Sequence, residues 1–314
     1  MLSNVGRLWA SAGVTFFVLL FCGYTYYIVA LIPSPSLPLI ATQRVVNASQ
    51  HDRWIFVGDV HGMFKEFQEL MQQVDASRPN TKVVLLGDFI VKGPDSAKMI
   101  HYLRENANST HCVLGNHEID VMFAYLNKKG LRTNFAQDKG SRWDPLEFST
   151  ESYIPSRDQV SSQHGLLAQQ LGQSNLAALA SLCSAELQIN LTPTGQTLVA
   201  VHAGLAPEYQ EFDSLNIKSI TTMKYMLPKD HSKTSKFKFD KARRWFKLWT
   251  RESAPEGVTV LYGHDAGRGL NLRHSTKGLD SACVSGGKLS ALEYVFKGGR
   301  YHEFLHQVGC RQFG

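Results

Sequence analysis

The sequence predicts an α/β domain with a mainly parallel sheet, preceded by a segment that spans a membrane. Short apolar runs alternate with helical patterns, and five of these runs end in residues of the types that bind metal ions. An uncharged apolar stretch near the N-terminus predicts the membrane segment. The length of 314 residues is ample for one large domain with a buried core. The net charge of +6 leaves nucleic acid, anionic lipid and polyphosphate open as partners.

The N-terminal segment 13–32 is apolar and uncharged, and no charge occurs between Arg7 and Arg44. A segment of this length just spans a hydrocarbon core of ~30 Å. A cleaved signal peptide is the alternative, but its apolar region is usually only ~7–15 residues long. We therefore expect a short cytosolic tail at 1–12, a transmembrane signal-anchor at 13–32 and a Pro- and Ser-containing linker at 33–50.

Glycosylation sites indicate the side of the membrane better than charge does, because Arg7 is the one charge before the anchor. N-glycosylation sequons begin at Asn47, Asn108 and Asn190. They fit a single-pass type II protein whose catalytic domain, 51–314, lies in a lumen. Four cysteines follow the anchor, and they allow either two bridges, in three pairings, or four buried free thiols.

Three apolar runs are each followed by a polar loop and then by a helical pattern, which is typical of βαβ units. The predicted strands are 54–57, 82–86 and 112–114, and the helices that follow them are 64–74, 96–104 and 119–126. Further helices are predicted at 161–171 and 174–183, and further strands at 198–201 and 258–262, whereas 130–165 shows weak periodicity. Two Gly-rich turns between 278 and 305 indicate an antiparallel meander at the C-terminal end.

Six side chains of metal-binding types follow the predicted strands. They are Asp59, His61, Asp88, Asn116, His202 and His264. Ligands of open α/β sheets gather beyond the carboxyl ends of the strands, so we expect these six side chains to lie together. Their oxygen and imidazole donors suit two divalent cations, for which zinc, manganese, cobalt and magnesium all qualify.

A pair of divalent cations would favour hydrolysis at phosphorus. Two ions ~3.5–4 Å apart share a water, lower its pKa and neutralise charge that develops on phosphate oxygens. Each motif alone has an ordinary explanation, because Gly-Asp at a strand end is often only a turn and a lone histidine there is often structural. All five motifs in order, each after a strand, favour a metal centre that hydrolyses phosphate esters or anhydrides.

The motifs that carry these side chains are Gly58–Gly62, Gly87–Pro94, Gly115–Glu118, Val201–Gly204 and Tyr262–His264. Together they resemble the calcineurin-like metallophosphoesterases, over residues 53–296. The resemblance implies an α/β fold that is a four-layer αββα sandwich with two metal ions at one edge. It implies that the first ion is held by Asp59, His61 and Asp88, and the second by Asp88, Asn116, His202 and His264. His117 would be the general acid that protonates the leaving oxygen.

The second motif departs from the family pattern, which continues with an Asp-Arg pair where this chain has Val91-Lys92. In the family that carboxylate orients the catalytic histidine. Its loss leaves open what orients His117, with Asp265 as one candidate. Lys92 replaces a bidentate guanidinium with a point charge, and we expect it to contact substrate phosphate.

The C-terminal motifs narrow the resemblance. Residues 263–269, 277–283 and 286–289 are similar to the dinucleotide-tetraphosphate hydrolases, and with the anchor added the chain most resembles the fungal vacuolar zinc-dependent endopolyphosphatases. That subgroup implies Zn²⁺ as the metal and cleavage of internal phosphoanhydride bonds in inorganic polyphosphate. It also implies a place in the vacuole membrane with the catalytic domain luminal, and Arg268 as a phosphate contact. Nucleic acid is not expected as a partner.

Between Lys224 and Arg251 the chain carries ten Lys or Arg residues with aromatic residues interleaved, and Asp230 and Asp240 are its acidic residues before Arg251. A basic helix of this kind suits a long polyanion, because binding releases counterions. It equally suits an anionic membrane surface, or a solvated face whose aromatic side packs in the core.

Three other functions stay open. A Ser/Thr phosphoprotein phosphatase would use the same metals, but Val91-Lys92 and the luminal signals weigh against it. A dinucleoside-tetraphosphate hydrolase fits the C-terminal motifs, but not the anchor. A non-catalytic module that binds polyanions or tethers to membranes would not need the complete ligand set together with His117.

Overall fold

The computed structural model describes residues 14–15, 17–25, 37–128, 136–137, 160–208 and 217–313. The chain separates into two compact units, 1–36 and 37–314. In the first unit the described residues are helical, and all of them fall inside the expected anchor. The rest of the anchor, the tail at 1–12 and the start of the linker lie outside the described residues. Among the helices that are described, none combines the length and the apolar character needed to cross a bilayer.

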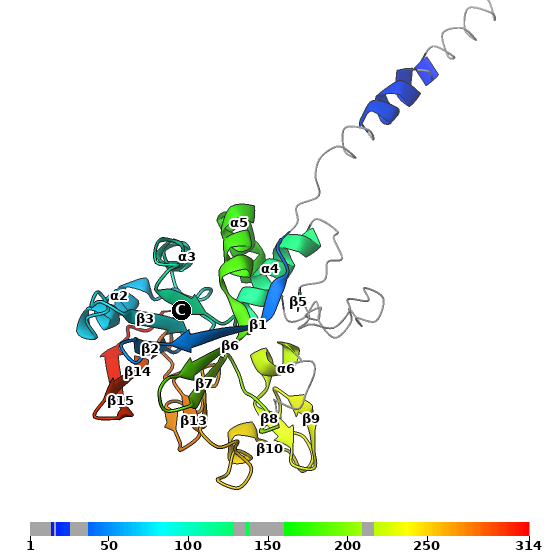
Figure 1. Ribbon diagram of the computed structural model, residues 1–314. Coiled ribbons are helices and arrows are strands. Elements are labelled where there is room, and N and C mark those ends of the chain that lie inside the picture. The colour runs from blue at the N-terminus through cyan, green and yellow to red at the C-terminus, as the bar shows by residue number, and fades with distance from the viewer. Residues whose placement is uncertain are drawn as a thin grey trace, which may run out of the picture. The chain divides into compact units, whose positions relative to one another are not determined.

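A five-stranded sheet in the second unit contains the βαβ units expected from the sequence (Figure 1). Its strands, in spatial order, are β15 (Arg300–Gly309), β14 (Lys288–Lys297), β2 (Arg53–Val57), β3 (Thr81–Leu85) and β4 (Thr110–Cys112). Strands β2, β3 and β4 run parallel, as predicted. Strands β14 and β15 form an antiparallel hairpin, and β14 pairs antiparallel with β2.

A seven-stranded sheet makes up the other half of the fold. Four of its six strand pairings are parallel and two are antiparallel, so it is a mixed sheet with the parallel majority that the sequence predicted. Its strands, in spatial order, are β12 (Asn271–Leu272), β13 (Thr276–Gly278), β11 (Val258–Tyr262), β7 (Gln196–Val201), β6 (Ser184–Leu191), β1 (Ile40–Ala48) and β5 (Ala136–Gln137). Strands β7 and β11 are those predicted at 198–201 and 258–262. The expected C-terminal meander is divided, because β13 joins this sheet and the β14–β15 hairpin joins the other.

Strand β1 lies inside the segment 33–50 that was expected to be a linker. It pairs in parallel with β6 from Ala41 to Ala48, and the side chains of Ile40 and Thr42 are buried. The preceding Pro-Ser run dominated the composition of this segment and concealed the strand. The catalytic unit therefore begins earlier in the chain than the expected boundary at residue 51.

The two sheets pack face to face. Successive side chains of a strand point to opposite faces, so every second residue of an inner strand reaches the space between the sheets. Trp54 and Phe56 of β2 share one buried cluster with Ile189 of β6 and Leu198 of β7, and this cluster contains no helical residue. The hydrophobic layer between the sheets is therefore built by strands and their adjoining loops.

Helices cover the outer faces of this pair of sheets. They are α2 (Phe64–Gln73), α3 (Ser96–Glu105), α4 (Asn116–Lys128), α5 (Ser162–Leu182) and α6 (Ile217–Thr222). Helix α2 packs against β14 and β15, whereas α5 packs against β1 and α6 against β6. Gly172 has a φ of 68° and kinks α5 at the boundary between the two helices predicted there.

The basic segment after α6 is not the helix that the sequence suggested. It forms a small third sheet of β8 (Tyr225–Leu227), β9 (Asp230–Ser235) and β10 (Arg243–Arg244), followed by the single 3₁₀ turn η3 (Trp245–Lys247). Trp245, Phe246 and Trp249 are buried in the core, while Phe237 is exposed. Most of the aromatic residues therefore anchor the segment, and its cations remain on the surface.

Two disulfides answer the question of cysteine pairing. Cys112 is bonded to Cys183 and Cys283 to Cys310, with Cα–Cα distances of 4.7 and 5.2 Å. Cys112 ends β4 of one sheet, and Cys183 directly precedes β6 of the other. The first bridge therefore ties the two facing sheets together close to the loop that carries Asn116.

Candidate metal centre

The six predicted ligand side chains come together at the carboxyl ends of strands from both sheets. Asp59 and His61 follow β2, Asp88 follows β3, Asn116 opens α4 after β4, His202 follows β7 and His264 follows β11. The backbone at three of these positions has a positive φ: 48° at His61, 49° at Asp88 and 70° at His264. Such conformations cost roughly 1–3 kcal/mol for residues other than glycine, so the surrounding structure must hold these loops in place.

Two glycines let the backbone approach the carboxylates of the site. A Cβ atom on Gly263 would lie 2.0 Å from Oδ1 of Asp59, and one on Gly115 would lie 2.1 Å from Oδ1 of Asp88. Both distances are far inside van der Waals contact. The glycines of the Tyr262–His264 and Gly115–Glu118 motifs are thus needed for close packing against the ligands.

Asp88 lies between two groups of donor atoms. Its Oδ2 atom is 3.8 Å from Nε2 of His61 and 3.3 Å from Nε2 of His202. On the first side, Nε2 of His61 is 4.0 Å from Oδ2 of Asp59. On the second side, Nδ1 of His264 is 3.2 Å from Nε2 of His202. One carboxylate is therefore placed to bridge two cations, each with further ligands of its own.

The ring nitrogen that points away from the centre is held by a backbone carbonyl in each of the three histidines. Nδ1 of His202 lies 2.8 Å from the Leu86 carbonyl oxygen, and Nδ1 of His61 lies 3.3 Å from that of Ile90. In His264 it is Nε2 that lies 3.0 Å from the Thr222 carbonyl oxygen. Because a carbonyl only accepts, each ring donates outward and turns its other nitrogen toward the centre, where a metal ligand must lie.

Asn116 supplies a direct test of whether these residues fit a metal ion. Its Oδ1 atom is buried and has no hydrogen-bond partner among the residues that the structure describes. A buried carbonyl oxygen without a partner costs about 1–3 kcal/mol, and native structures rarely leave one. A divalent cation is the partner that this oxygen lacks, so the donor set fits the metal centre.

The protonation states of the metal-free site follow from burial and from the charge on Asp88. Burial opposes a charge on His202, but the charge and hydrogen bond of Asp88, with smaller contributions from Asp59 and the Leu86 carbonyl, together raise the pKa of His202 to about 10. Burial lowers the pKa of His61 to about 3, despite the attraction of Asp88. Burial raises the pKa of Asp59, and repulsion from Asp280 adds to this effect. A cation at Asp88 would displace the proton on His202, so metal binding is coupled to proton release.

Glu118, which sequence reasoning did not single out as functional, holds the loops of the site in place. Its carboxylate accepts hydrogen bonds from the backbone N–H groups of Asp88 at 2.7 Å, Gly115 at 2.8 Å and Ile90 at 3.0 Å. Burial, with a contribution from Asp88, raises its pKa to about 7. Glu118 thus links the second and third motifs, which explains why an acidic residue ends the Gly115–Glu118 motif.

His117 lies beside the metal site and is oriented by a second histidine. Its backbone N–H donates to Oδ1 of Asp88 at 3.0 Å, and its Nε2 is 3.8 Å from Oδ2 of that residue. Its Nδ1 lies 2.8 Å from Nε2 of His164, in the first turn of α5. Asp120 also has a carboxylate oxygen within 4.8 Å of a ring nitrogen of His117 and of His164, but the hydrogen bond of His117 Nδ1 is with His164.

The direction of this hydrogen bond follows from the start of α5. The backbone N–H of Ser161 donates to Nδ1 of His164 at 3.0 Å, as part of a capping box. Because Nδ1 of His164 accepts, its proton is on Nε2, and that atom donates to Nδ1 of His117. Neutral His117 therefore carries its own proton on Nε2, the atom that faces Asp88. Burial lowers the pKa of His117 to about 4, which favours this neutral form.

The suggestion that Asp265 orients His117 is wrong. The carboxylate of Asp265 is instead bound by Lys224 Nζ at 2.9 Å and by Arg244 Nη1 at 2.6 Å. His164 takes the place of the missing family carboxylate. It lies 47 residues beyond His117, in the first turn of α5, and the sequence signal that could have marked it is the Ser161-x-x-His164 capping pattern.

The two expected phosphate contacts differ in position. Nζ of Lys92 lies 2.8 Å from Nε2 of His61, so this cation is at the metal site. The guanidinium of Arg268 lies 5.7 Å from the ring centroid of Phe246, on an exposed turn after His264. Contact of either residue with phosphate stays a prediction.

Several known proteins are similar to this chain. The family model of the calcineurin-like phosphoesterases matches residues 53–298. A zinc-dependent endopolyphosphatase of Saccharomyces cerevisiae is 40% identical over 309 residues, covering 92% of this chain and 93% of that protein. A symmetrical bis(5'-nucleosyl)-tetraphosphatase of Erwinia tasmaniensis is 27% identical, and the match covers 77% of this chain and 93% of the Erwinia protein. The crystal structure of a candidate diadenosine tetraphosphatase superposes with a TM-score of 0.61 at 25% identity, covering 85% of this chain and 98% of that chain.

Proposed function

Because the chain belongs to the calcineurin-like phosphoesterase family, we propose that it is a zinc-dependent endopolyphosphatase that cleaves internal phosphoanhydride bonds of inorganic polyphosphate. Its chemistry is that of a metal-dependent phosphohydrolase. The observation that carries this conclusion is the Asn116 oxygen, which is buried and has no hydrogen-bond partner within the described part of the chain, beside two groups of ligands that share Asp88. The polyphosphate substrate is supported by the relative in Saccharomyces cerevisiae, whose similarity covers 92% of this chain.

The ligand residues of the site would bind two metal ions. Asp59, His61 and Asp88 would hold one ion, and Asp88 would share the second with Asn116, His202 and His264. The ions would supply an activated water and positive charge for the phosphate oxygens.

His117 is placed to protonate the leaving phosphate oxygen from Nε2, while His164 holds its other nitrogen. Lys92 extends the positive charge of the site toward the substrate, since its ammonium lies beside His61. Both chain ends released from an internal cut carry negative charge, so this cation can also stabilise the leaving chain.

A luminal location is proposed for the catalytic unit. The two disulfides suit an oxidising compartment. Asn47 and Asn108 are exposed at the first residue of their sequons, and Asn190 lies beside Asn47 on the neighbouring strand. With the uncharged run at 13–32 as a signal-anchor, these features support a type II protein of the vacuole membrane.

Gel sizing of long-chain polyphosphate incubated with the protein and Zn²⁺ tests the reaction. Internal cleavage shortens the whole population early, with little orthophosphate released. Asn116→Ala and His117→Ala should abolish the shortening, whereas His101→Ala, at an exposed histidine of α3, should not. Release of orthophosphate from chains that otherwise stay long would contradict internal cleavage.

A dinucleoside-tetraphosphate hydrolase is the second candidate, because the relative in Erwinia tasmaniensis and the solved structure described above are both named for that activity. Diadenosine tetraphosphate should be offered to the same preparation at equal concentration. If it is cleaved with a higher kcat/KM than long polyphosphate, the second candidate replaces the first.

A further inference from the structure

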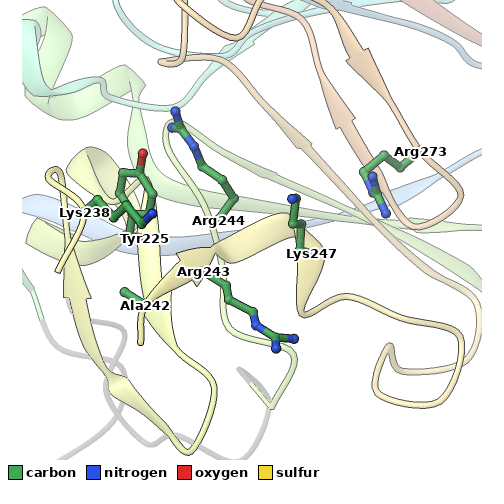
Figure 2. Close-up of a pocket in the computed structure, with 7 residues that line it drawn as sticks. All are labelled: Tyr225, Lys238, Ala242, Arg243, Arg244, Lys247 and Arg273. Carbon is green, nitrogen blue, oxygen red and sulfur yellow. The ribbon is translucent and has the colours of Figure 1, made fainter. Parts of the chain in front are cut away.

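A cavity of about 620 Å³ lies in the region of the small third sheet, within the ~300–1,000 Å³ range of ligand sites. It is lined by Tyr225, Lys238, Ala242, Arg243, Arg244, Lys247 and Arg273. Figure 2 shows that its cations come from three segments: the loop after β9, the β10–η3 stretch, and the turn between β12 and β13. Five of the seven lining residues are thus basic and none is acidic.

Most of these cations have no acidic partner. Arg244 is bound to Asp265, and its guanidinium also lies 4.5 Å from the centroid of the Tyr225 ring. Lys238, Arg243 and Lys247 are exposed, and among the described residues no carboxylate lies within ion-pair distance of them. Like charges held around one hollow repel each other, and an anionic ligand relieves that repulsion.

The cavity adjoins the metal centre through two short segments. Asp265, which binds Arg244 of the cavity wall, is the residue directly after the ligand His264. Thr222, whose carbonyl oxygen holds the His264 ring, lies three residues before Tyr225 of the cavity wall. A chain-like substrate that crosses the metal centre therefore has a positively charged hollow next to its path.

We propose that this cavity binds the part of a polyphosphate chain that extends beyond the bond being cleaved. The proposal rests on the proposed function, and it explains why the enzyme would prefer long polyphosphate chains to short ones. Exposed Lys and Arg side chains on three segments suit a flexible row of phosphates better than one fixed phosphate. Their interaction with the chain releases counterions and is therefore sensitive to salt.

Single-stranded nucleic acid is the other polyanion to consider, and the aromatic residues disfavour it. Sequence-tolerant binding of single strands depends on exposed rings on which bases stack. Trp245, Phe246 and Trp249 are buried, and the Tyr225 ring is covered by Arg244. Phe237 is exposed but does not line the cavity. Tyr225 is thus the one aromatic residue of the cavity lining, and Arg244 already lies against its ring, so the hollow offers mainly charge, which matches a polyanion that has no bases.

The first test replaces three exposed cavity cations in one variant, Lys238→Gln/Arg243→Gln/Lys247→Gln. A matched control, Lys65→Gln/Arg78→Gln/Lys98→Gln, removes the same charge from α2, the turn after it and α3. The cavity variant should lower kcat/KM for long-chain polyphosphate about 10-fold relative to tripolyphosphate, which equals ~1.4 kcal/mol. It should also flatten the salt dependence for long chains. The control should leave the ratio of long to short substrate unchanged.

The second test measures binding without turnover. Fluorescently labelled long-chain polyphosphate is titrated into full-length Asn116→Ala protein, with and without the three cavity substitutions, and a single-stranded oligonucleotide of equal charge is the competitor. The substitutions should weaken polyphosphate binding about 10-fold, and the oligonucleotide should compete poorly.

The outcomes separate the cavity from the activity. If the wild-type protein cleaves polyphosphate but the cavity variant keeps the full preference for long chains, the cavity proposal is wrong and the proposed function stands. If polyphosphate is never cleaved yet binding depends on the three cations, the proposed function is wrong and the cavity site stands. Stronger binding of the oligonucleotide than of polyphosphate would overturn the ligand class.

Discussion

Replacement of His164 should impair catalysis without removing the metals. His164 is not in either group of ligands around Asp88, but its Nε2 lies 2.8 Å from Nδ1 of His117. A hydrogen bond of this kind contributes about 0.5–1.5 kcal/mol, and ~1.36 kcal/mol corresponds to a tenfold change in rate. A general acid contributes about 10²–10⁴-fold in total. His164→Ala should therefore lower kcat on polyphosphate between about 10-fold, if His117 stays near its position, and about 100-fold, if its ring turns away.

The choice of leaving group distinguishes this positioning role from a structural one. Protonation matters most for an alkoxide leaving group and much less for p-nitrophenolate, which is a far weaker base, so His164→Ala should lose much more kcat on glycerol phosphate than on p-nitrophenyl phosphate. Zinc content and melting temperature should stay close to those of the His101→Ala control, since His101 is an exposed histidine outside the site. His164→Gln, which retains a donor group, should recover part of the polyphosphate activity.

Two results would refute the reasoning about His164. Equal loss on both substrates would mean that the substitution damages the whole site rather than the proton donor. Full activity of His164→Ala on polyphosphate would mean that another group orients His117. Asp120, which has an oxygen within 4.8 Å of both rings, would then be the residue to replace.

Three further predictions follow from the close packing, the disulfides and the titration of the site. Gly263→Ala should abolish zinc binding because its Cβ would lie 2.0 Å from Asp59 Oδ1, whereas Gly267→Ala, with open space around it, should bind zinc normally in a metal assay. Replacing Cys112 and Cys183 together by Ser should lower the free energy of unfolding by about 4 kcal/mol, because the bridge closes a loop of 71 residues; equal denaturation midpoints would contradict this. In protein freed of metal by a chelator, the pKa of His202 is raised to about 10. The ion pair of His202 with Asp88 therefore stabilises the fold fully below pH ~6.5, and this stabilisation is lost as the pH rises toward 10. The melting temperature should decrease over this pH range, and added zinc should largely remove the decrease.

The ligands could be found from the sequence because each one directly follows a strand. Buried parallel strands read as continuous apolar runs, and their carboxyl ends converge, so Asp59, Asp88 and Asn116 could be placed together from local pattern alone. The structure brings His202 and His264 to the same place from the other sheet. Each ligand could therefore be identified from the strand that directly precedes it in the chain.

The features that sequence reasoning missed depend on contacts between distant segments. His164 approaches His117 only because α5 packs against α4. Asp265 follows a ligand in sequence, but Lys224 and Arg244 draw its carboxylate away from His117. Charge composition alone did not reveal that the basic segment forms a small sheet and 3₁₀ turn, because alternating basic and aromatic residues fit a helix and short strands equally well.

Anomalous X-ray diffraction at the zinc edge, from crystals grown with Zn²⁺, tests the two-metal centre most directly. Two peaks should appear on either side of the Asp88 carboxylate, one against Asp59 and His61 and the other against Asn116, His202 and His264. A single peak, or two peaks that leave the Asn116 oxygen without a bond, would contradict a two-metal phosphohydrolase.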